Sequence, residues 1–243
     1  MKEAEWYVDW FNSSYYHLLY NHRDDEEANY FINLLCESLK LKKGAKIWDL
    51  ACGKGRHAIA LNKKGYVVTG TDLAANSIRE ASAYASETLE FLVHDMREPF
   101  RLDYFDAVFN LFTSIGYFPN ISDNYPVFKD VATSLKTGGY FVVDFFNAYK
   151  VVANMNPEYT EQRGDITFHI RKRVEGKFIF KHIEFRAGGR HYEFEESVSL
   201  LTQADFEDFA KGTGLTPVKT YGNYHLEAFD EKTSDRLVLV FKK

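Results

Sequence analysis

The 243-residue sequence contains only two cysteines, Cys36 and Cys52. Two thiols are too few for a disulfide framework or, alone, for a zinc site, so we expect a reducing cytoplasm and no bound metal. Long hydrophobic runs are also absent, since none approaches the ~20 residues that span a bilayer. The acidic segment Met1–Trp6 is not typical of a signal peptide. We therefore expect no membrane partner.

Basic charge is scarce as well, because 30 Lys and Arg stand against 35 Asp and Glu, a net charge of -5. Proteins that bind nucleic acid neutralise phosphates with clustered Lys and Arg. Nucleic acid is thus excluded as the expected partner. Aromatic residues, by contrast, make up 16% of the chain, and several lie in residues 5–23.

Strand and helix patterns alternate through the middle of the chain, which predicts a parallel sheet with helices on both faces. The expected strands cover residues 47–50, 66–71, 89–94, 105–110 and 140–146, and the expected helices follow the first strand and cover 74–85 and 123–135. A further helix over 202–211 precedes two last strands, 216–221 and 236–241. We expect a single domain over 1–243, with a core over 45–147 and a closing unit over 200–243.

Two segments depart from this alternation. Residues 1–44 read as an N-terminal helical cover that is free to lie over the first strand's end. Residues 163–199 alternate with period two and predict three antiparallel strands, with turns at Glu175-Gly176 and Gly188-Gly189. That register places Lys181 beside Ile170 and Glu196. One face of this insertion is apolar, with Ile166, Phe168, Ile183, Phe185, Tyr192 and Phe194.

The turn after the first strand reads Asp49-Leu-Ala-Cys-Gly-Lys-Gly55. Its small residues let the backbone turn tightly and approach a ligand, and the next helix points free N–H groups at that ligand. Asp72 ends the second strand, where an acid binds ribose hydroxyls in doubly wound sheets. Two alternatives stay open: Asp72 caps the helix that begins at Ala74, or Gly53-x-Gly55-x-x-Ala58 belongs to an NAD site.

The ends of the next two strands carry further ligand signals. Asp95 and Met96 follow the third strand, where a carboxylate and a flexible apolar side chain suit an adenine ring. A surface turn beside Pro99 is the alternative. The stretch 110–117 is rich in small and aromatic residues, as expected where a ligand tail and a second substrate meet.

These motifs together resemble class I S-adenosylmethionine-dependent methyltransferases. The resemblance covers residues 45–147 and rests on five motifs in order: Asp49–Arg56, Thr69–Asp72, His94–Met96, Phe105–Val108 and Leu135–Gly139. It implies an α/β, Rossmann-like fold: a doubly wound, mostly parallel seven-stranded sheet whose seventh strand is antiparallel between the fifth and sixth. The opening Tyr16-x-x-x-Tyr20, the motif Thr113–Tyr117 and the insertion look more narrowly like small-molecule N-methyltransferases.

The resemblance also implies roles for individual residues. The cofactor would be S-adenosyl-L-methionine, with Asp72 on the ribose, Asp95 on the adenine amino group and Asn110 at the amino-acid end. The full set of implied cofactor-binding residues is Tyr16, Arg23, Asp49, Ala51, Gly53, Gly55, Asp72, Leu73, Asp95, Met96 and Asn110.

The acceptor would be a small molecule with a nitrogen or oxygen nucleophile, and orientation in a dry pocket can drive much of such a transfer. Candidates for an assisting base are His169, His182, His191 and His225, and candidates for positioning are Tyr117 and Asn147. We expect the insertion to cover the acceptor site or to form a homodimer through its apolar face. An NAD-linked oxidoreductase and a non-catalytic S-adenosylmethionine-binding module are the rival hypotheses.

Overall fold

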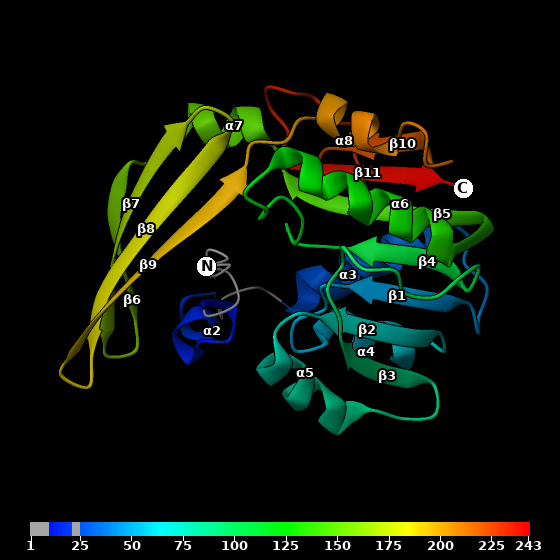
Figure 1. Cartoon of the computed structure of the whole chain (residues 1–243), viewed down its shortest axis with the longest axis horizontal. Coiled ribbons are helices and arrows are strands. Elements are labelled where there is room, and N and C mark those ends of the chain that lie inside the picture. Colours follow the sequence, from blue (N-terminus) through cyan, green and yellow to red (C-terminus); the bar gives the residue numbers. More distant parts are fainter. Residues whose placement is uncertain (1–9, 21–24) are drawn as a thin grey trace.

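The computed structural model describes residues 10–20 and 25–243. Its strands form a seven-stranded sheet in the order β10-β11-β5-β4-β1-β2-β3 and a four-stranded sheet in the order β6-β7-β8-β9 (Figure 1). The strands are β1 Lys46–Leu50, β2 Val67–Asp72, β3 Leu89–Val93, β4 Phe105–Asn110, β5 Leu135–Phe146, β6 Glu158–Arg163, β7 Ile166–Glu175, β8 Phe178–Ala187, β9 Arg190–Ser199, β10 Thr216–Tyr221 and β11 Arg236–Lys242. The helices are α2 Ser14–Tyr20, α3 Asp25–Ser38, α4 Arg56–Lys63, α5 Ala75–Ala81, α6 Asn124–Ser134, α7 Ala148–Ala153 and α8 Gln203–Ala210.

The seven-stranded sheet has the expected topology. Strand β1 pairs in parallel with β2 and β4, while β11 pairs antiparallel with both β5 and β10. The predicted doubly wound fold is therefore confirmed. Because the carboxyl ends of β1 to β4 lie along one edge of the sheet, loops that follow these strands meet there.

Helices cover both faces of this sheet. On one face, Phe128 of α6 and Phe206 of α8 pack on the strands, and on the other face Leu35 of α3 and Leu61 of α4 do so. All four side chains are fully buried. Since the central strands are buried on both sides, they read as short apolar runs in the sequence.

Strand β5 begins earlier than expected. The sequence predicted a helix to residue 135 and a strand from residue 140, but Leu135 already pairs with Phe105, and the register shifts before Ala107 pairs with Tyr140. Gly138 has a φ of 83°, a conformation that glycine adopts without steric cost. The glycine pair thus forms an irregular start of a strand.

The insertion sheet has four strands, so the prediction of three is wrong. Strand β6 pairs with β7 from Glu158 opposite Arg171 to Arg163 opposite Ile166. Its sequence, Glu-Tyr-Thr-Glu-Gln-Arg, has a single apolar side chain. That composition hides the strand from a search for alternating hydrophobicity.

The register of β8 and β9 is as predicted, with Phe185 opposite Tyr192, but the register of β7 and β8 is wrong by two residues. Ile170 faces Ile183, and Lys172 faces Lys181. The strands are joined at Gly176-Lys177, one residue later than expected. A shift of two keeps every side chain on its own face, so the hydrophobic pattern could not detect it.

Residues 10–20, the N-terminal segment that the structure describes, lie between the two sheets. Trp10 and Leu19 are fully buried with Phe168, Ile183 and other apolar side chains of the insertion. On the other side, the Asn12 side chain accepts a hydrogen bond from the Asn76 backbone N–H at 3.3 Å. Figure 1 shows α2 between the insertion sheet and α5. The apolar face is thus covered by the chain itself, and a homodimer stays a prediction.

Candidate functional site

A cavity of about 380 Å³ lies at the carboxyl ends of β1 to β4. Loops after all four strands contribute to its wall, and so does the N-terminal segment. The lining residues are Phe11, Tyr16, His17, Tyr20, residues 50–54, Arg56, His57, residues 71–74, Ser77, residues 94–96, residues 111–114, Tyr117 and Phe118.

The glycine turn presents its backbone to this cavity. Ala51 and Gly53 have φ angles of 63° and 56°, and a Cβ atom added to Gly53 would meet nothing within 4 Å. Gly55 differs, because an added Cβ would lie 2.5 Å from a ring carbon of Phe91. Gly55 precedes α4 and lies outside the cavity wall, so its small size serves the packing of the turn.

The Asp72 carboxylate joins the glycine turn to the second strand. It accepts a hydrogen bond from the Gly53 N–H at 2.8 Å through one oxygen and from the Ala74 N–H at 2.8 Å through the other. Ala74 is the N-cap residue of α5 and has no side-chain cap hydrogen bond, so Asp72 holds the turn before the helix, and it also lines the cavity. Burial raises its pKa. A carboxylate oxygen accepts more than one hydrogen bond, so both can also accept from ligand hydroxyls.

Asp49 and Asn110 are buried behind the glycine turn and do not line the cavity. Asn110 is fully buried at the end of β4 and donates to the Leu50 carbonyl at 2.9 Å. Asp49 is 1% exposed, and burial raises its pKa to about 7. Among the described residues, Oδ2 of Asp49 and Oδ1 of Asn110 have no hydrogen-bond partner.

Leu73, Asp95 and Met96 lie in the cavity wall. Asp95 is ion-paired with Arg97, whose Nη2 lies 2.6 Å from Oδ2. Burial works to raise the pKa of Asp95, but hydrogen bonds from Arg97 outweigh it and the pKa is lowered. Asp95 is consequently a charged hydrogen-bond acceptor beside two apolar side chains.

Aromatic rings form a second part of the cavity wall. Phe11 contacts Tyr16 and Tyr117 with ring centroids 4.9 and 5.2 Å apart, and Tyr16 contacts Tyr20 at 4.9 Å. Tyr16 and Tyr117 were named from the sequence, whereas Phe11 and Tyr20 were not assigned to the site. Nothing in a local motif distinguishes a ring that lines a cavity from a ring in the core.

Tyr20 connects the cavity to the insertion sheet. Its hydroxyl donates to Glu196 at 2.7 Å and accepts from the Lys181 ammonium at 2.6 Å. Trp10 Nε1 also donates to Glu196, at 2.6 Å. Burial, followed by the charge of Glu196, raises the pKa of Tyr20 well above its usual value. The tyrosine therefore stays protonated and fixed.

A second buried network supports the loop after β4. Phe112 and Thr113 both have a φ of 60°, which is strained for residues with a side chain. Asp144, fully buried, accepts from the Phe112 N–H at 2.8 Å and pairs with Arg236 Nε at 2.8 Å. Arg236 Nη2 then donates to the Thr113 hydroxyl at 3.0 Å. The ion pair holds the strained residues in the cavity wall.

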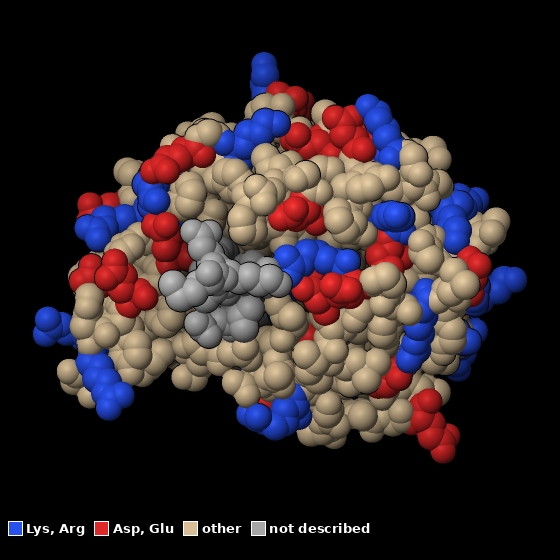
Figure 2. Space-filling model, in the orientation of Figure 1, with Lys and Arg blue, Asp and Glu red and all other residues tan. Residues whose placement is uncertain are grey.

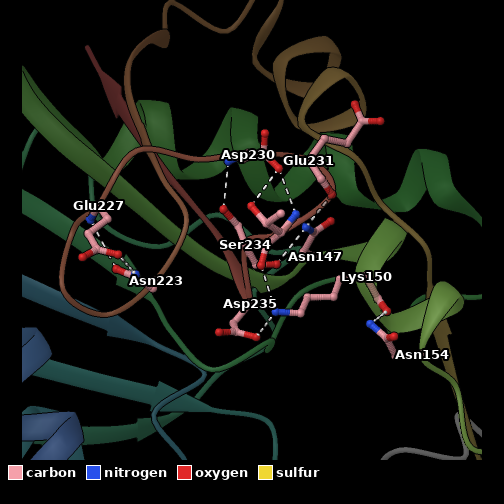
Figure 3. Close-up of polar contacts among 10 residues, drawn as sticks. Asn147, Lys150, Asn154, Asn223, Glu227, Asp230, Glu231, Ser234 and Asp235 are labelled. Atoms are coloured by element: carbon pink, nitrogen blue, oxygen red, sulfur yellow. Dashed lines mark hydrogen bonds and ion pairs between the residues drawn. The ribbon is translucent and has the colours of Figure 1, made fainter.

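Other candidates lie away from the cavity. Asn147 caps α7, and its Nδ2 donates to the carbonyls of Glu231 and Ser234 (Figure 3). His182 lies on the outer face of the insertion sheet, where it faces Arg171 and Glu195.

The remaining predicted histidines do not line the cavity either. His191 bonds Glu184 at 2.9 Å, His169 is exposed, and His225 packs on Tyr30. Arg23 lies outside the described residues.

Three histidines that were not among the predicted base candidates line the cavity: His17, His57 and His94. His94 directly follows β3, which is a positional signal, whereas His57 lies in the first turn of α4. Burial, and next the charge of Lys54, lower the pKa of His17. Burial also lowers the pKa of His94.

Charge on the face shown in Figure 2 is mixed, with acidic and basic side chains interspersed. Within residues 10–20 and 25–243, no cluster of His, Cys, Asp and Glu could hold a metal ion. No helix in that part of the chain is both long and apolar enough to cross a membrane.

Sequence comparison identifies relatives of this chain. Residues 47–139 match the family model described as a methyltransferase domain. A protein of Geobacillus sp. (strain WCH70) named as a methyltransferase is 35% identical over 226 residues, which cover 83% of this chain and 86% of the relative. The methyltransferase YqeM of Bacillus subtilis is 35% identical over 133 residues, which is 53% of each chain.

Solved structures share the fold across nearly the whole length. An S-adenosylmethionine-dependent methyltransferase from Clostridium acetobutylicum superposes with a TM-score of 0.78 at 22% identity, over 94% of this chain and 95% of the other. The amino pentose methyltransferase CalS10 of Micromonospora echinaspora, bound to S-adenosylmethionine, gives 0.72 at 17% identity, over 95% and 97%.

Proposed function

Because this chain belongs to the class I S-adenosylmethionine-dependent methyltransferases, we propose that it transfers a methyl group to a nitrogen or oxygen atom of a small molecule. One observation carries the proposal. A single cavity joins a wall of backbone and carboxylate groups to a wall of aromatic rings. A cofactor and a small acceptor can therefore meet in one space. The NAD-linked alternative is not supported by the family.

The residues of the first wall fit S-adenosylmethionine. The open space at Gly53 admits a ligand against the main chain, and the Asp72 oxygens can accept from ribose hydroxyls. Leu73 and Met96 would flank the adenine, with Asp95 accepting from its amino group. When bound, this cofactor supplies an electrophilic methyl group for in-line displacement. The chain holds the two reactants in line, which can lower the barrier by ~7–11 kcal/mol in favourable cases.

The second wall suits a small acceptor that carries an amine. Aromatic faces attract cations at close range, and Phe11, Tyr16, Tyr20 and Tyr117 cluster there. An amine must lose a proton before it attacks. His17 lines the cavity with a lowered pKa, so its neutral ring can accept that proton.

Calorimetric titrations with S-adenosylmethionine, S-adenosylhomocysteine and NADH test the proposal first. We expect the two adenosyl compounds to bind and NADH not to bind. Transfer of a labelled methyl group from S-adenosylmethionine into a small-molecule cell extract would then identify the product. Cofactor binding without transfer to any amine, hydroxyl, thiol or carboxylate would instead favour a non-catalytic module.

A further inference from the structure

The insertion sheet carries a row of charge on its inner face, which is otherwise apolar on β7, β8 and β9. The row consists of Lys172 on β7, Lys181 on β8 and Glu196 on β9. Two lysines thus face each other directly across neighbouring strands. Like charges in that position are destabilising, so the arrangement costs stability unless an anion offsets it.

Carboxylates nearby are already engaged. Glu196 accepts from Trp10 and Tyr20 and lies 4.0 Å from Lys181. Asp235 is paired with Lys150 at 2.5 Å, as Figure 3 shows.

Lys172 differs from Lys181 in its surroundings, because the Lys181 ammonium lies 4.0 Å from Glu196. Its ammonium lies over the Tyr159 ring, 5.0 Å from the centroid. Among the residues that the structure describes, no carboxylate is within ion-pair distance of it.

Lys172 borders a second cavity. This cavity, of about 450 Å³, lies between α7 and strands β6 and β7, and Lys150, Asn154, Asn156, Tyr159 and the Lys150-paired Asp235 also line it. Burial, and next the charge of Lys181, lower the pKa of Lys172 and outweigh the opposing charges of Glu196 and Glu161. An anion beside this ammonium would relieve the repulsion and could accept hydrogen bonds from amide groups of the asparagines.

We propose that the Lys172 cavity binds an anionic group, a phosphate or a carboxylate. Lys181 contacts both the Lys172 row and Tyr20, which lines the first cavity.

Titration of pyrophosphate and of malonate into the full chain at constant ionic strength tests the site. We expect at least one of them to bind, and Lys172→Met to weaken that binding about tenfold to a hundredfold, the effect of losing a charged hydrogen bond. Lys172→Arg should retain binding. Lys129→Met, on the exposed side of α6, is the matched control and should bind as the wild type does. A preference for pyrophosphate or malonate distinguishes phosphate from carboxylate.

Unfolding midpoints separate binding from a structural role. If Lys172 is retained for an anion, Lys172→Met should be as stable as the wild type or more stable, because it removes the lysine–lysine repulsion. Unchanged anion binding in a folded Lys172→Met variant, or no binding of either probe to the wild type, would overturn the site. S-adenosylmethionine affinity is measured in parallel. Loss of anion binding with normal cofactor affinity supports the site, whereas a wild type that binds anions but not the cofactor would refute only the proposed function.

Discussion

The part of the cavity wall at the ends of β1, β2 and β3 contains the glycine turn and the carboxylates of Asp72 and Asp95, whereas residues 11–20 and 112–118 line the cavity with aromatic side chains. The first wall is fixed by short motifs on consecutive strands. The second depends on how distant segments pack. We therefore expect the first wall to bind the cofactor whatever the acceptor, and the second wall to select the acceptor. The variants below test this division.

Arg236→Met should have the largest effect, because the loop it supports, Phe112-Thr113, borders both walls. The change leaves the fully buried Asp144 without its cation, which costs ~3–5 kcal/mol of unfolding free energy. Urea unfolding measures this loss. Arg171→Met removes an exposed arginine 3.7 Å from Glu184 and should cost less than ~0.5 kcal/mol. Equal effects of the two changes would contradict the role of the buried pair.

Asp49→Asn should stabilise the protein at alkaline pH. Burial raises the pKa of Asp49 to about 7, so ionising it costs more in the folded than in the unfolded chain. Its contribution to stability is therefore lost as pH rises from about 4 to about 7. At pH 8 the variant should gain on the order of 2–4 kcal/mol, and at pH 4 almost nothing. Urea unfolding at both pH values is the measurement, and a variant that is no more stable at pH 8 would refute the burial argument.

Asp72→Ala tests the backbone wall itself. It removes the acceptor for Gly53 and Ala74 N–H groups and for the ribose hydroxyls, so cofactor affinity should fall by ~1–3 kcal/mol. Calorimetry on the folded variant gives the number. The exposed Asp208→Ala serves as control and should leave affinity unchanged. If Asp72→Ala bound the cofactor as tightly as the wild type does, Asp72 would not be the ribose ligand.

Tyr20→Phe tests the aromatic wall and should have the smallest effect. The change breaks the contacts with Glu196 and Lys181 but keeps the ring. Once an acceptor is identified, we expect methyl transfer to fall about tenfold (~1.4 kcal/mol) through a higher acceptor KM, with cofactor affinity unchanged. Tyr125→Phe, on an exposed tyrosine, should change neither. Weaker cofactor binding in Tyr20→Phe would mean that the two walls are not separable.

The backbone wall could be predicted from the sequence because its signals are local. A glycine turn after one strand and an acid at the end of the next define Gly53 and Asp72, and strand order brings them together. The same reasoning also named Gly55, Asp49 and Asn110, which the structure places behind the cavity wall. Local spacing does not show which side of a turn a ligand occupies.

The aromatic wall could not be predicted in the same way. Tyr20 lines the cavity because Glu196 and Lys181, more than 150 residues later, hold its hydroxyl. The pairing of Lys172 with Lys181 could not be predicted for a related reason. A register shift of two residues leaves the apolar face unchanged, so the hydrophobic pattern fits both registers. Long-range pairing of this kind has no signature in a single sequence.

A crystal structure with S-adenosylhomocysteine tests the central claim most directly. The account predicts the ribose hydroxyls within hydrogen-bond distance of the Asp72 carboxylate, the adenine between Leu73 and Met96, and the sulfur directed toward the aromatic wall. An adenosyl group bound elsewhere, or a cavity closed by the protein's own side chains while the ligand binds in solution, would contradict it.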